Sequence, residues 1–117
     1  SPLRGNTEEK CVELPCLAMQ RASELMDKSN KYGMDKNLSL SDRRYNFCVF
    51  GARAIEWADV AVLELSEWAA RSELLAKHYS DAKLLAIADE MKRNLGGYKK
   101  VRDDLLHTCK EILVEGK

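Results

Sequence analysis

Four cysteines are the side chains of this 117-residue chain with the clearest covalent chemistry. An even number of cysteines fits two disulfides in an oxidising compartment, or small buried hydrophobic residues in a reducing one. In an antiparallel helical hairpin that turns near Tyr79, Cys48 and Cys109 would face each other, so we expect them to form a disulfide. Cys11 and Cys16 remain as a local pair, with Cys16–Cys109 as an alternative connectivity. The pairing favours a periplasmic or secreted protein.

The remaining side chains do not combine into a metal or cofactor site. His107 and Cys109 are two residues apart, so on a helix they point in nearly opposite directions. The pair Cys11 and Cys16 lacks the second pair of ligands that a zinc site needs. The sequence contains no glycine-rich phosphate loop, no GxSxG and no HExxH motif. We therefore expect no cofactor, no metal and no catalytic residues, and we predict that the protein is not an enzyme.

One pair of residues suggests a different chemistry. Arg71 and His78 are seven residues apart on one predicted helix, which is similar to the Arg-x4-6-His signature of HEPN-type ribonucleases. The resemblance covers these two residues only, and it implies a cytosolic helical protein that binds or cuts RNA. A histidine near a helix C-terminus is also explained by its favourable interaction with the helix dipole. Glu64, Glu67 and Arg71 have the spacing of a solvated, mutually paired helix edge.

The elements that position these residues are predicted to be helices. Ala, Leu, Glu and Lys dominate the composition, and only two prolines and six glycines occur. An apolar stripe with steps of three and four continues through Gly96 and Gly97, which indicates one helix buried along its length. The stripe consists of Leu84, Ala88, Met91, Leu95, Tyr98, Val101, Leu105, Cys109 and Ile112. The fold class is therefore all-α.

Three helices and an N-terminal arm account for the chain. Residues 1–14 are predicted to be a flexible arm, and residues 15–117 a single helical-bundle domain. A first helix begins at Pro15 and ends near Lys31, and Ser39 to Asp42 offer caps for a second, much longer helix. That helix turns into a third at residues 78–81, where Ser80 or Asp81 is the expected N-cap. The architecture is an antiparallel hairpin with a shorter first helix.

The short first helix leaves part of the hairpin uncovered. It reaches along the second helix only to about Trp57, so the apolar residues beyond that point need another partner. The expected partner-binding residues are Trp57, Ala61, Leu65, Trp68 and Leu75, with Leu85, Ile87 and Met91 opposite them on the third helix. A homodimer that completes a four-helix bundle is the favoured solution. Alternatively, the second helix breaks near Ser66 or Ser72 and folds into a compact monomer.

The charge balance narrows the kinds of partner. Lys and Arg together number 19, as do Asp and Glu, so the chain has no net charge and lacks the positive field of a nonspecific nucleic-acid binder. No apolar run is long enough for a membrane span. We predict a small extracytoplasmic protein that acts by binding another protein, of the inhibitor, immunity-factor, secretion-accessory or chaperone type. The alternative is the cytosolic RNA-binding protein or ribonuclease based on Arg71 and His78.

Overall fold

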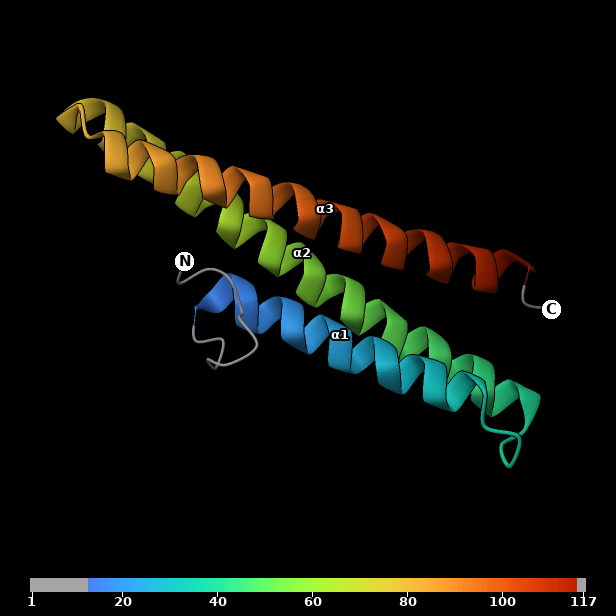
Figure 1. The fold of residues 1–117 in the computed structure, drawn as a ribbon. Coiled ribbons are helices and arrows are strands. Elements are labelled where there is room, and N and C mark those ends of the chain that lie inside the picture. Colours follow the sequence, from blue (N-terminus) through green and yellow to red (C-terminus); the bar gives the residue numbers. More distant parts are fainter. Residues whose placement is uncertain (1–12, 116–117) are drawn as a thin grey trace.

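A computed structural model describes residues 13–115, and side chains as far as Cys109. These residues form three α-helices, α1 (Leu14–Gly33), α2 (Leu40–Tyr79) and α3 (Ala82–Glu115), and no strand within that range. The predicted all-α class and the long hairpin are confirmed (Figure 1). Residues 1–12 of the predicted arm lie outside the described residues.

The helix ends follow the capping residues of the sequence. Ser39 is the N-cap of α2, and its hydroxyl accepts a hydrogen bond of 3.0 Å from the backbone N–H of Asp42. Ser80 ends α2 in the left-handed conformation, with φ of 51°. The Asp81 carboxylate then accepts bonds from the backbone N–H groups of Lys83 and Leu84. A two-residue connection therefore reverses the chain between two long helices.

The α2–α3 hairpin is held by a core that runs along both helices. Leu65, Ala69 and Met91 form a buried cluster against which further apolar side chains pack, namely Trp68, Leu95 and Tyr98. Further along, Arg102 of α3 lies 3.8 Å from Asp59 of α2. α3 continues without interruption through Gly96 and Gly97, as the apolar stripe predicts.

α1 packs antiparallel on the N-terminal half of α2. The buried Ser29 hydroxyl donates a hydrogen bond of 2.7 Å to the carbonyl of Phe47. The Tyr32 and Phe50 rings stack with their centroids 5.3 Å apart. The core of this half consists of Leu25, Met26, Phe47 and Ala54, and Leu105 of α3 packs against it.

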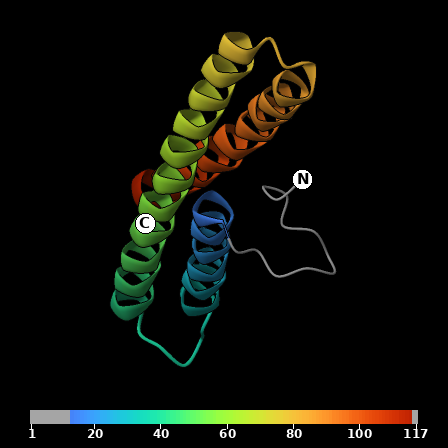
Figure 2. The same cartoon turned by 90° about the vertical axis from the view of Figure 1, so that its left-hand side faces the viewer.

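The molecule is long and thin. Its extents are 60 × 30 × 14 Å, and its radius of gyration is 17.4 Å, against about 13 Å for a compact domain of this length. α1 and α3 both pack on α2 and scarcely touch each other (Figure 2). α1 has 20 residues and α2 has 40, about 30 Å and 60 Å of helix. Half of α2 therefore has no α1 beside it (Figure 1).

Two details of the sequence-based architecture differ in the structure. α2 continues unbroken through Ser66 and Ser72, so the described chain does not fold back into a compact four-helix monomer. A Cβ atom added to Gly33 would contact Phe47, and one added to Gly51 would lie 3.5 Å from Ser29 Oγ, so this antiparallel register places Leu14 near the level of Ser66. α1 therefore extends about two turns past Trp57, because its last residue, Gly33, packs against Phe47 rather than against the first residues of α2.

Candidate protein-binding surface

α1 covers one side of α2, and the same side of α2 continues past the first residue of α1 toward the hairpin turn. Phe50 and Trp68 are eighteen residues apart, which is five full turns, so they have the same angular position on α2. Phe50 faces α1, where its ring stacks on that of Tyr32. Trp68 is half-buried, and Leu75, two turns later on this side, is 51% exposed. No other described helix takes the place of α1 there.

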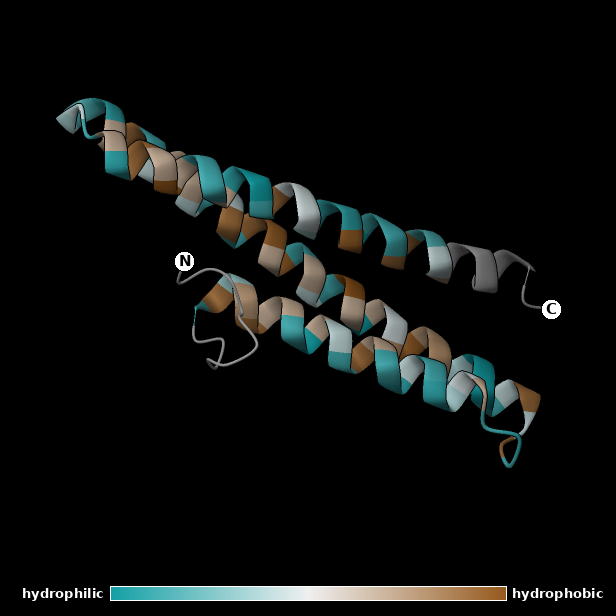
Figure 3. Cartoon of the chain, in the orientation of Figure 1, coloured by the Kyte–Doolittle hydropathy of each residue, from teal (hydrophilic) through white to brown (hydrophobic). Residues whose placement is uncertain are grey.

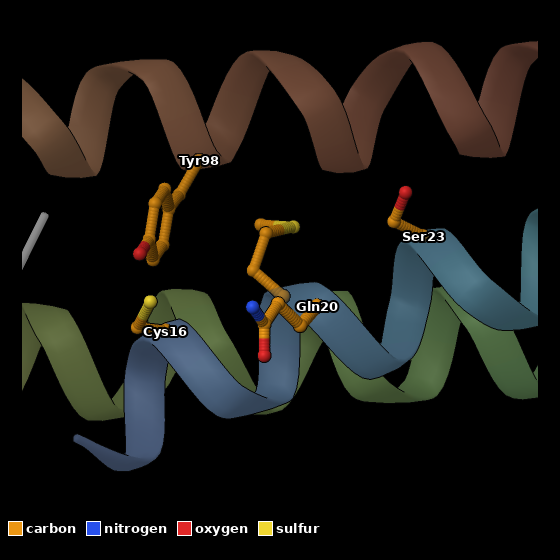
Figure 4. Close-up of a pocket in the computed structure, with 5 residues that line it drawn as sticks. Cys16, Gln20, Ser23 and Tyr98 are labelled. Atoms are coloured by element: carbon orange, nitrogen blue, oxygen red, sulfur yellow. The ribbon is translucent and has the colours of Figure 1, made fainter. Parts of the chain in front are cut away.

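α3 presents the corresponding side from across the hairpin. In Figure 4, Tyr98 points from α3 toward Cys16 of α1. Ile87 precedes Tyr98 by eleven residues, about three turns, and so faces the same direction beyond the start of α1. Its side chain is 42% exposed. α2 and α3 thus both direct apolar side chains toward the position that α1 leaves vacant.

We call the resulting patch the tip surface; it consists of Trp68, Leu75 and Tyr79 of α2 and Ile87 of α3. Figure 3 shows that apolar residues continue along both helices of the hairpin past the first turn of α1. Single exposed apolar residues are ordinary, but several on one side of a helical hairpin indicate a contact surface.

The predicted partner-binding residues divide between this surface and the core. Ala61 and Leu65 are fully buried within the monomer, because α1 reaches further than expected and Leu65 lies between α2 and α3. Trp57 lies in the part of α2 along which α1 packs, and its side chain is 39% exposed. Trp68 and Leu75 belong to the tip surface. The available surface is therefore shorter than predicted and is shifted toward the hairpin turn.

Tyr79, which the sequence predicts to lie in the turn, belongs instead to the last turn of α2. Its spacing of eleven residues from Trp68 is the signal that could have placed it on the tip surface.

The cysteines are positioned by the same hairpin. Cys109 is buried on α3, and a Cβ atom added to Gly51 of α2 would come within 2.9 Å of its Sγ. Cys48 is one turn before Gly51, so the predicted register is correct to within a turn. Both thiols are free in the structure, which does not form the predicted disulfide. Burial, together with the nearby Cys48, raises the pKa of the Cys109 thiol. Because Cys109 is free, the alternative Cys16–Cys109 disulfide is not formed either; Cys16 is buried in α1, and Cys11 lies outside the described residues.

Arg71 and His78, the residues of the ribonuclease resemblance, are exposed on α2. Arg71 lies 3.4 Å from Glu67, as the helix-edge interpretation predicts. The ring of His78 packs edge-on against that of Tyr79, with centroids 4.8 Å apart. Both contacts are local, and neither supplies a geometry for RNA cleavage.

A small cavity of about 300 Å³ lies between α1 and α3, where these helices scarcely touch (Figure 4). Its lining consists of Cys16, Met19, Gln20, Ser23 and Tyr98. Burial raises the pKa of the Tyr98 hydroxyl, so this group is a neutral donor at physiological pH. The lining contains no charged side chain, and its polar side-chain groups are those of Gln20, Ser23 and Tyr98.

Comparisons with known proteins give no family or homologue for this chain: no family model, no curated protein and no solved structure matches it. Among the described residues, no three side chains form a group suited to hold a metal ion. Over the same range, none of the helices has the length and apolar character needed to cross a bilayer.

Proposed function

We propose that this protein acts by binding another protein through the tip surface, and that it does so without catalysis. The observation that carries the proposal is the start of α1 at Leu14, beyond which no described helix covers Trp68, Leu75 and Ile87 on that side of the α2–α3 hairpin. Full burial of a large apolar side chain is worth about 1.5–3 kcal/mol, and Leu75 and Ile87 are 51% and 42% exposed. A partner that covers these side chains would bind with a few kcal/mol of favourable free energy from their burial, most of it at the centre of the interface.

We further propose that the protein works in an oxidising compartment, the periplasm or the cell exterior, with Cys48 and Cys109 joined. Their places on facing turns of α2 and α3 support this pairing. Oxidation of two thiols to one disulfide releases two protons and two electrons, which a thiol–disulfide oxidoreductase of such a compartment accepts. The bond would tie the C-terminal half of α3 to α2 and stiffen the hairpin that presents the tip surface.

A photocrosslinker placed on the tip surface tests the binding function directly. We would replace Leu75 with p-benzoylphenylalanine in the cells that make the protein, and irradiate them. Leu74 is the matched control, because it is the same residue type in the same turn, is 69% exposed and points about 100° away. The proposal expects a protein adduct at position 75 and much less at position 74. Equal labelling at both positions, or none at position 75, would contradict it.

A further inference from the structure

We infer that the protein bound at the tip surface is a second copy of this chain, in a twofold dimer whose two α2–α3 hairpins form a four-helix bundle. The inference rests on the proposed function and names its partner. Where α1 lies beside the hairpin, it packs on α2 and scarcely touches α3. Beyond the first residue of α1, no described helix covers the hairpin, which is a two-helix layer there, and two such layers packed face to face are a four-helix bundle.

The hairpin tip, taken over all sides of its two helices, has balanced charge, which suits contact between identical copies. Residues 66–93 contain five acidic and five basic side chains: Glu67, Glu73, Asp81, Asp89 and Glu90, with Arg71, Lys77, Lys83, Lys92 and Arg93. A surface with one dominant sign of charge would repel its own copy and attract an opposite partner. This balanced surface does neither. Its apolar residues therefore decide the contact, and they are the same on both copies of an isologous dimer.

The position of α1 determines the orientation of the two copies. α1 lies on the same side of the hairpin as the tip surface, but over the opposite half. If the two hairpins met in parallel, the two α1 helices would occupy the same space. In the antiparallel arrangement, the α2–α3 connection of each copy instead contacts the first helical turn of the other copy's α1. Leu14 and Leu17 are exposed in that first turn, so the apolar contact continues there.

The surface is small for a stable dimer. Residues 66–79 span about 20 Å of helix, and two adjacent helices are about 20 Å wide. The footprint is thus about 400 Å² in projection, below the roughly 800 Å² per partner of a standard stable complex. We therefore expect a reversible dimer with a dissociation constant in the micromolar range.

Sedimentation equilibrium of the purified full chain, from about 1 to 300 µM, tests this inference. We expect a monomer–dimer equilibrium for the wild type, at least tenfold weaker association for Leu75→Glu, and wild-type behaviour for Leu74→Glu. Both substitutions are at exposed positions, and thermal melts by circular dichroism establish that both variants are folded. A wild type that stays monomeric at the highest concentration overturns the inference. So does a dimer that Leu75→Glu and Leu74→Glu affect equally.

The crosslinking experiment separates failure of this inference from failure of the proposed function. An adduct at position 75 with twice the mass of the chain supports the second copy. An adduct with a foreign protein, combined with a monomeric wild type, overturns the second copy and leaves the binding function standing. A monomeric protein without any adduct overturns both.

Discussion

The Cys109 thiol lies over the backbone of Gly51, and this contact brings α3 close to α2 near the N-terminal end of the hairpin. A Cβ atom at position 51 would come within 2.9 Å of Cys109 Sγ and 3.5 Å of Ser29 Oγ. The first of these distances is shorter than nonbonded atoms accept. Gly51 therefore lies where side chains from both other helices approach α2, and its missing side chain is a packing requirement.

Gly51→Ala should lower the stability of the protein. Alanine gains about 1 kcal/mol over glycine inside a helix, whereas forcing extra volume into a packed core costs about 1–3 kcal/mol. We expect the packing cost to exceed the gain, because the nearest atom belongs to a short, buried side chain. Urea unfolding followed by circular dichroism measures the difference. A midpoint equal to or above that of the wild type would contradict the close approach of α3.

Gly96→Ala provides the contrasting case on α3. Nothing lies within 4 Å of a Cβ atom at this position, and the backbone there is helical. The same substitution should therefore stabilise the protein, by about 0.5–1 kcal/mol. The urea midpoint should rise without a change in the slope of the unfolding curve. A decrease in stability would mean that α3 does not run straight through the two glycines.

Ser29→Ala should cost about 0.5–1.5 kcal/mol, the net worth of an ordinary hydrogen bond. The Ser29 hydroxyl is fully buried and donates to the Phe47 carbonyl, 2.7 Å away. That carbonyl also accepts a bond within α2, so the substitution does not leave it without a partner. Ser23→Ala, at an exposed position on the same helix, is the control and should be near neutral. Equal effects of the two substitutions would show that the buried bond contributes nothing.

The helices could be predicted from the sequence because their signals are local. Apolar steps of three and four mark α3 across Gly96 and Gly97, and Ser39 and Asp81 cap α2 and α3 where the sequence places them. The facing of Cys48 and Cys109 needed only the position of the turn, since the rise per residue is the same in both helices. A helical hairpin can thus be predicted from a single sequence.

The candidate surface could be predicted only in part. Leu65 and Leu75 both lie on apolar lines of α2, but one is fully buried and the other half-exposed. The difference depends on how far α1 extends along α2 toward the hairpin turn and on the direction of α3. Both are set by tertiary packing, which the apolar periodicity of the sequence does not encode. The sequence likewise indicates that two cysteines are neighbours, whereas their oxidation state depends on the compartment.

The pH dependence of stability should contain a contribution from Glu73. A side-chain hydrogen bond from Lys92, and then contacts with Lys77 at 2.9 Å, hold the pKa of Glu73 at about 2, below its ordinary value of 4.5. A carboxylate whose pKa is depressed on folding stabilises the folded state above pH 4.5, and loses that contribution as the pH falls toward 2. Thermal midpoints of wild type and Glu73→Gln, measured from pH 2 to 6, should converge at the acidic end. A constant gap would contradict the ion pairs.

The two thiols of the hairpin should react at different rates in the reduced protein. Burial and the proximity of Cys48 raise the pKa of Cys109, so less of it is thiolate at neutral pH, whereas Cys48 is partly exposed. We expect iodoacetamide to modify Cys48 first, and Cys109 at a rate that increases when the protein is unfolded in urea. Peptide mass spectrometry of a time course at pH 8 measures both rates. Intact mass after alkylation of the unreduced protein then tests the proposed pairing, because thiols joined in a disulfide take no label. Modification of Cys109 before Cys48 would contradict the packing of Cys109 against Gly51.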